Sequence, residues 1–118
     1  MPEINIFKND SNFRIYEPRA VIFQRGDPSD CMYAVIEGEV DILVNEQVID
    51  TARSGTLIGE MAMIDNSPRS ATAVAKTRAK LVPVSQKQFL FMVQQTPFFS
   101  IQVMQIMADR LRRLMGNI

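Results

Sequence analysis

The chain has 118 residues, enough for one domain with a hydrophobic core but too few for two domains in series. Thirteen basic and thirteen acidic side chains cancel, so no net charge attracts it to nucleic acid or to an anionic membrane. It has no histidine and one cysteine, which excludes histidine general bases, Ser/His and Cys/His dyads, and the usual zinc ligand sets. We therefore expect a binding protein with no catalytic residues, no metal site and no cofactor.

The compartment is predicted from the cysteine and from the absence of targeting patterns. Cys31 has no second cysteine with which to form an intrachain disulfide, and it lies in a strand-like run that favours a buried thiol. The first ten residues lack the basic and apolar regions of a signal peptide. The longest apolar run, residues 89–93, is far shorter than the roughly 18 residues of a membrane span. We expect a cytoplasmic protein without a membrane contact.

The first two thirds of the sequence predict strands. Residues 1–18 are expected to form a helical or irregular lead-in, and residues 19–84 contain short apolar runs separated by glycine turns. The Glu37-Gly38 step is predicted to be a tight hairpin turn. This pattern indicates an antiparallel β-roll or jelly roll, the double-stranded β-helix. The predicted strands cover residues 21–23, 31–36, 40–44, 48–52, 70–75 and 80–84.

The remaining residues, 85–116, predict two helices. Ser85 suits the N-cap of a short helix over residues 86–95. Pro97 suits the first turn of a longer helix that reaches about Met115, with Gly116 as its C-terminal cap. The fold class is therefore mainly β with flanking helices.

The longer helix carries an apolar stripe at three-four spacing, typical of a coiled-coil seam. A second apolar line, Val103, Met107 and Leu114, lies on a different face. If one face packs on the barrel, the other needs a partner, which predicts a homodimer. The alternative is a helix buried on two sides of its own domain. The residues of the predicted seam are Ile101, Met104, Ala108, Leu111 and Met115.

Residues 59–72, Gly-Glu-Met-Ala-Met-Ile-Asp-Asn-Ser-Pro-Arg-Ser-Ala-Thr, carry the clearest chemistry. Gly59 lets the backbone approach a ligand, and a helical turn after it would present unsatisfied amides of the kind that bind phosphate. Arg69 supplies a guanidinium fork for two phosphate oxygens, and Ser70 adds donors. Glu60 can accept a hydrogen bond from a sugar hydroxyl. Together they indicate a ribose phosphate.

This window resembles the phosphate-binding cassette of the cyclic nucleotide-binding domain. Catabolite activator proteins, regulatory subunits of cyclic-AMP-dependent kinase and cyclic nucleotide-gated channels share that domain. Residues 23–27 resemble its first glycine loop, residues 33–40 its strand-Glu-Gly-strand hairpin, and residues 107–114 the end of its long helix. The resemblance implies a β-roll that binds a cyclic nucleotide reversibly, without chemistry.

The resemblance also assigns the site. It implies that Glu60 binds the ribose 2′-hydroxyl, that Arg69 binds the cyclic phosphate, and that backbone groups complete the phosphate contacts. The serine at position 70 resembles the residue at the matching position of bacterial cyclic-AMP receptors, which favours cyclic AMP over cyclic GMP as the ligand. The full set of implied ligand-binding residues is Gly59, Glu60, Met61, Ala62, Arg69, Ser70 and Ala71, with Ile42, Ile49 and Leu57 beneath the base.

The chain departs from the family's bacterial members at the long helix. Leu114 and Met115 stand where hydroxyls would contact the base, so Arg110 or Arg113 either stacks over the purine or belongs to a solvated helix end. The sequence ends two residues after Gly116, so we expect no DNA-binding domain and an effector protein on another chain.

Two other interpretations remain open. One is a module of the same fold that dimerises or docks without binding a nucleotide, with Glu60 and Arg69 paired to each other in a surface salt bridge. The other is a cupin-like enzyme, which the missing histidines disfavour.

Overall fold

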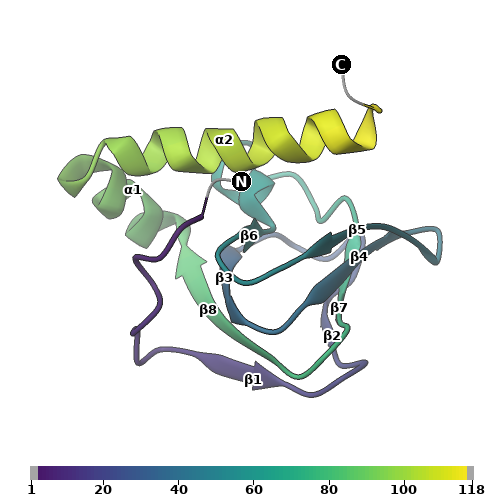
Figure 1. Ribbon diagram of the computed structural model, residues 1–118. Helices are drawn as coiled ribbons and strands as arrows, with labels where there is room; N and C mark the ends of the chain where they lie inside the picture. The colour runs from purple at the N-terminus through teal and green to yellow at the C-terminus, as the bar shows by residue number, and fades with distance from the viewer. Residues whose placement is uncertain (1–2, 117–118) are drawn as a thin grey trace.

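The computed structural model describes residues 3–116, and these fold into two four-stranded antiparallel sheets covered by helices (Figure 1). The arrangement confirms the predicted β-roll, and each of the six predicted strands is present. The first sheet contains, in spatial order, β1 (Arg14–Tyr16), β8 (Ala79–Ser85), β3 (Cys31–Glu37) and β6 (Leu57–Ile58). The second contains β2 (Val21–Phe23), β7 (Thr72–Ala75), β4 (Val40–Val44) and β5 (Gln47–Ala52).

Strand β3 lies at the centre of the core because it is apolar on both faces. Tyr33 and Val35 point into a cluster between the two sheets, whereas Met32 and Ala34 point into a second cluster beneath the helices. Side chains alternate across a strand, so a continuous apolar run buries both faces. Strand β8 follows the same rule and pairs with β3 along most of its length. The first sheet is therefore the middle layer of the molecule.

Two strands were not predicted. Residues 14–16 fall within the predicted irregular lead-in, yet they form β1, which pairs with β8 and places Ile15 opposite Lys80. Strand β6 has only two residues and pairs with β3 at Tyr33 and Ala34. Both segments are too short for a periodic sequence pattern, and they adopt strand structure because they pair with a longer neighbouring strand.

The predicted hairpin at Glu37-Gly38 is wrong. Strand β3 pairs with β6 and β8, and β4 pairs with β5 and β7, so the chain crosses from one sheet to the other at Gly38. Gly38 has φ +84°, and a Cβ atom there would clash with the carbonyl oxygen of Arg78. The hairpin lies between β4 and β5 instead, where Asn45 and Glu46 both have positive φ, as a type I′ turn requires.

Gly38→Ala should lower the free energy of unfolding by about 3 kcal/mol, because the left-handed backbone and the clash with Arg78 both oppose a side chain. Gly26→Ala is the matched control, since Gly26 has φ +91° with no heavy atom within 4 Å of its Cβ position. It should cost only about 1 kcal/mol. Urea unfolding of both variants measures the difference, and equal losses would contradict the close approach at Gly38.

Three helical elements cover the first sheet and the mouth of the roll. A 3₁₀ helix, η1 (Glu60–Met63), follows β6, and α1 (Gln86–Gln95) and α2 (Phe98–Leu114) follow β8. The predicted cap of α1 is confirmed, because the Ser85 hydroxyl accepts a hydrogen bond from the Gln88 amide at 3.1 Å. Helix α2 lies across the top of the molecule in Figure 1. Within residues 3–116, no helix is both long and apolar enough to cross a bilayer.

Helix α2 is attached through the first part of its length by apolar packing. Phe99, Val103 and Ile106 are its buried residues, and the ring of Phe99 lies 6.0 Å from that of Phe7 in the N-terminal segment. The predicted seam faces away from the roll: Ile101, Met104, Leu111 and Met115 are exposed and Ala108 is half-buried. Of the second apolar line, Val103 and Met107 pack on the core and Leu114 is exposed.

Candidate functional site

The segment singled out in the sequence forms a loop between two sheets. Strand β6 ends at Ile58, and the next residue, Gly59, has a φ of +70° that turns the chain into η1. The loop then returns along the β2–β3 connection: the Gly26 amide donates to the Arg69 carbonyl at 2.8 Å, and the Arg69 amide donates to the Asp27 carbonyl at 2.9 Å. The backbone of Arg69 is therefore fixed from both sides.

The Arg69 side chain is a buried cation that lacks a close counter-ion. It is 6% exposed. Its Nη2 donates to the Cys31 carbonyl at 2.6 Å, and its Nη1 donates to the Gly59 carbonyl at 3.4 Å. The carboxylate of Asp30 is 3.9 Å away and its side chain is 90% exposed, so it neutralises the charge weakly. The Nε atom is buried and has no hydrogen-bond partner in the described residues, and an unsatisfied buried N–H group is costly.

A cavity of about 90 Å³ lies beside Arg69. It is smaller than the roughly 300–1,000 Å³ of a typical small-molecule site, so it can hold a phosphate-sized group but not a whole nucleotide. Six of the seven predicted ligand-binding residues line it, and Ala62 lies in η1 beside them. The lining residues are Phe23, Ser29, Gly59, Glu60, Met61, Ser67, Pro68, Arg69, Ser70 and Ala71.

Glu60 is paired with α2 and not with Arg69. The Glu60 side chain is 7% exposed, and its Oε1 accepts from Nη1 of Arg110 at 2.6 Å. Arg110 also donates from Nε to Asp50 at 3.1 Å and from Nη2 to the Leu57 carbonyl at 2.8 Å. Among the described residues there is no salt bridge between Glu60 and Arg69, so the alternative of a surface pair is wrong. One guanidinium thus joins α2 to η1, β5 and β6.

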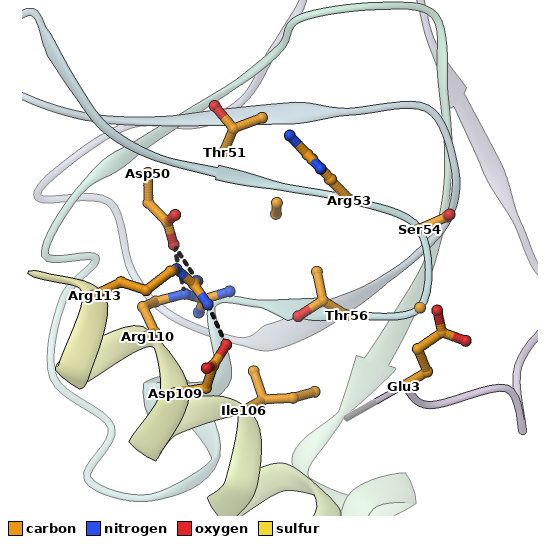
Figure 2. Close-up of a pocket in the computed structure, with 12 residues that line it drawn as sticks. Glu3, Asp50, Thr51, Arg53, Ser54, Thr56, Ile106, Asp109, Arg110 and Arg113 are labelled. Atoms are coloured by element: carbon orange, nitrogen blue, oxygen red, sulfur yellow. Dashed lines mark hydrogen bonds and ion pairs between the residues drawn. The ribbon is translucent and has the colours of Figure 1, made fainter. Parts of the chain in front are cut away.

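A second cavity, of about 600 Å³, lies between α2 and the β5–β6 turn (Figure 2). Asp50, Asp109, Arg110 and Arg113 form a charged wall on one side, and Thr51, Arg53, Ser54 and Thr56 line the other. Glu3, Ala52, Gly55 and Ile106 complete the lining. Because Arg110 lines this cavity and contacts Glu60, which lines the smaller one, their ion pair lies at the boundary between the two.

The charged wall also holds Arg113 in place. Its Nη2 donates to Asp50 at 3.0 Å, and its Nη1 pairs with Asp109 one turn earlier in α2. Burial alone would lower the pKa of Arg113, but the hydrogen bonds and charges of Asp50 and Asp109 raise it overall. The sequence prediction of a solvated helix end is wrong for Arg110, whose side chain is mostly buried in these ion pairs.

The three residues predicted beneath the base do not gather at either cavity. Leu57 is fully buried in the core under α2, Ile49 is exposed on β5, and Ile42 is half-buried against the core between the sheets. Sequence patterns did not reveal Asp50 or Phe23 as residues of the site. Asp50 sits in a strand of ordinary composition, and only its place opposite α2 reveals its role.

A sequence profile described as the cyclic nucleotide-binding domain matches residues 13–96, which include both sheets and the loop around Arg69. The chain belongs to this family. The match confirms the predicted family, and the matched range includes residues 59–72. We therefore call the small cavity beside Arg69 the cassette cavity.

Individual relatives agree with this assignment. The chain is 46% identical over 57 residues to a cAMP-dependent protein kinase regulatory subunit of Candida albicans, a match that covers 48% of this chain and 12% of the relative. Among solved structures it is similar to the c-di-GMP-responsive global regulator CLP of Xanthomonas campestris, with TM-score 0.83 and 26% identity over 93% of this chain and 58% of that one.

The catabolite activator protein of Thermus thermophilus gives TM-score 0.75 and 28% identity over 85% of this chain and 49% of that one. The chain therefore spans 58% and 49% of these two regulators, and its 57-residue match spans 12% of the kinase subunit.

Proposed function

We propose that the chain binds a 3′,5′-cyclic nucleotide reversibly, with cyclic AMP preferred, and that it performs no chemistry on it. The observation that carries the proposal is the buried guanidinium of Arg69, whose Nε has no partner among the described residues and which borders a phosphate-sized cavity. A buried donor without a partner is costly, so an anion that accepts from it is stabilised.

The cavities support one orientation of the ligand. The cyclic phosphate enters the cassette cavity, where Arg69 and the amides around Ser70 act as donors. The ribose 2′-hydroxyl donates to the Glu60 carboxylate, and the base extends toward the larger cavity under α2, with Arg110 at the boundary.

The preference for cyclic AMP rests on Ser70 and on the kinase subunit of Candida albicans, whose name includes cAMP dependence. Cyclic GMP is the second ligand to test. Cyclic di-GMP is the third, because the Xanthomonas regulator is described as responsive to it.

Signal transfer is proposed to run through Glu60. A carboxylate has two oxygens, and one of them already accepts from Arg110 of α2. A ribose hydroxyl bound to the other oxygen would share the Glu60 carboxylate with Arg110 of α2. The affinity for the ligand would then depend on whether α2 lies in a position that keeps or breaks this ion pair. A partner chain that contacts the exposed face of α2 then senses the ligand.

The proposal of a non-catalytic, cytoplasmic sensor draws on composition. The sequence has no histidine to act as a general base at neutral pH, and the one cysteine, Cys31, is free and half-buried. Burial raises the pKa of the Cys31 thiol, which favours the protonated, unreactive form.

The test is calorimetric titration of the purified chain with cyclic AMP, cyclic GMP and cyclic di-GMP. We expect binding of one nucleotide per chain, tightest for cyclic AMP. Native mass spectrometry of the fresh protein would reveal a nucleotide retained during purification. Absence of binding to all three ligands, with no retained ligand, would contradict the proposal and favour a docking module of the same fold.

A homodimer through α2 is the proposed state of assembly, because the exposed seam offers an apolar stripe of the kind that pairs helices. Leu111→Glu should convert the dimer into a monomer in sedimentation equilibrium. Leu90→Glu, an equally exposed leucine on α1, should leave the dimer intact. A monomeric wild-type chain, or equal effects of both variants, would contradict the proposed dimer interface on α2.

A further inference from the structure

The ring of Phe23 lies directly under the guanidinium of Arg69, with Cζ 4.1 Å from the ring centroid. We propose that Phe23 is the positioning residue of the phosphate site, acting through Arg69. The inference rests on the proposed function, because it assumes that Arg69 binds the phosphate. Phe23 is the last residue of β2, where pairing with Ala73 of β7 fixes its backbone.

An aromatic ring stabilises a buried arginine differently from a carboxylate. A carboxylate accepts hydrogen bonds from the N–H groups and cancels the charge, whereas a ring attracts the cation through its face and uses none of the five N–H donors. The weak, exposed contact with Asp30 is the only ion pair of Arg69 among the described residues. Phe23 therefore compensates the burial of Arg69 while the Nε donor stays unpaired.

The Phe23 ring itself packs against a second aromatic ring. Tyr33 of β3 stacks on Phe23 with ring centroids 6.2 Å apart and an interplanar angle of 22°. Gly59 lines the cassette cavity, and because it has no side chain, it leaves room for the side chains of Arg69 and Phe23. A Cβ atom at position 59 would clash with Nη1 of Arg69 and stand 3.4 Å from Cε2 of Phe23. The Phe23 ring thus contacts both Tyr33 and the guanidinium of Arg69, which lines the cassette cavity.

The two carbonyl contacts of Arg69 complete this positioning. Nη2 donates to Cys31 and Nη1 to Gly59, which fixes the edge of the guanidinium that faces the protein. The Phe23 ring then fixes the orientation of the guanidinium plane. A leucine at position 23 keeps an apolar side chain but removes the attraction between ring and cation, so the guanidinium would lose its fixed orientation.

The experiment compares Phe23→Leu with Phe13→Leu, a matched control. Phe13 also carries a cation over its ring, with the Lys80 Nζ atom 4.3 Å from the centroid, but it does not line the cassette cavity. Calorimetry gives the Kd for cyclic AMP and for the two phosphorothioate diastereomers of cyclic AMP, in which sulfur replaces one or the other exocyclic oxygen. Thermal melting checks that each variant is folded.

Phe23→Leu should weaken binding of cyclic AMP about 10-fold and bring the affinities of the two diastereomers closer together, because a mobile guanidinium distinguishes the two oxygens poorly. Phe23→Tyr, which keeps a ring, should restore both properties, and Phe13→Leu should leave both unchanged. A folded Phe23→Leu variant with wild-type affinity and selectivity would overturn the inference, as would equal losses in Phe13→Leu. If the wild-type chain binds no cyclic nucleotide, the proposed function fails first.

Discussion

Arg69→Ala should weaken cyclic nucleotide binding at least about 100-fold. In the proposed complex the arginine would donate two or more charge-assisted hydrogen bonds to the phosphate, each contributing roughly 1.5–3 kcal/mol. In this chain the donor is also preorganised, since backbone hydrogen bonds from the β2–β3 loop and the Phe23 ring hold it before a ligand arrives. Calorimetric Kd values for wild type and variant measure the effect.

Two further variants make this test specific. Arg69→Lys keeps the charge but loses the planar fork, so we expect an intermediate affinity. Arg78→Ala removes an exposed arginine that pairs with Glu17 on the surface of the roll, and its affinity should equal that of wild type. If the alanine variant at position 69 keeps its affinity while folded, the assignment of the phosphate to this cavity is wrong.

Arg110→Ala should lower the free energy of unfolding by about 3–5 kcal/mol. Removing the arginine leaves Glu60 buried without its ion-pair partner and the Leu57 carbonyl without its donor, and breaking one side of a buried pair carries this cost. Asp50 is affected less because Arg113 still donates to it. Urea unfolding gives the value. Arg112→Ala, an exposed neighbour in α2, should change stability by less than about 0.5 kcal/mol.

The double variant Arg110→Ala with Glu60→Gln separates the ion pair from the packing, because both variants in the comparison carry alanine at position 110. Replacing both charges removes the unpaired carboxylate, so the double variant should be more stable than Arg110→Ala. If the two variants are equally unstable, the loss comes from packing of the Arg110 side chain, and the ion pair with Glu60 contributes little.

The sequence predicts the roll, the helices and the cassette because each depends on local chemistry. Alternating apolar residues predict β4, and the Ser85 cap predicts the start of α1 to the residue. The cassette is continuous in sequence, so glycine, acid, proline and arginine in residues 59–69 indicate an anion site before any contact is known.

The rest of the site depends on residues far apart in the chain. Glu60 and Arg110 are separated by 50 positions, and Phe23 reaches Arg69 from the opposite end of the roll sequence. No spacing rule connects such residues. Gly38 illustrates the same limit: a Glu-Gly step is compatible with a hairpin or with a crossing between sheets, and only the pairing of β3 with β8 decides.

Helix α2 is held by apolar packing near its start and by ion pairs near its end. Its first part is anchored by Phe99, Val103 and Ile106 in the core, and its last turns are held by Arg110 and Arg113 on carboxylates. Dissolved salt screens charges, most strongly where they are exposed to solvent, but leaves apolar burial intact. Raising the ionic strength should therefore weaken the partly exposed contacts of Arg113 first, while the buried ion pairs of Arg110 and the apolar contacts of the first turns persist.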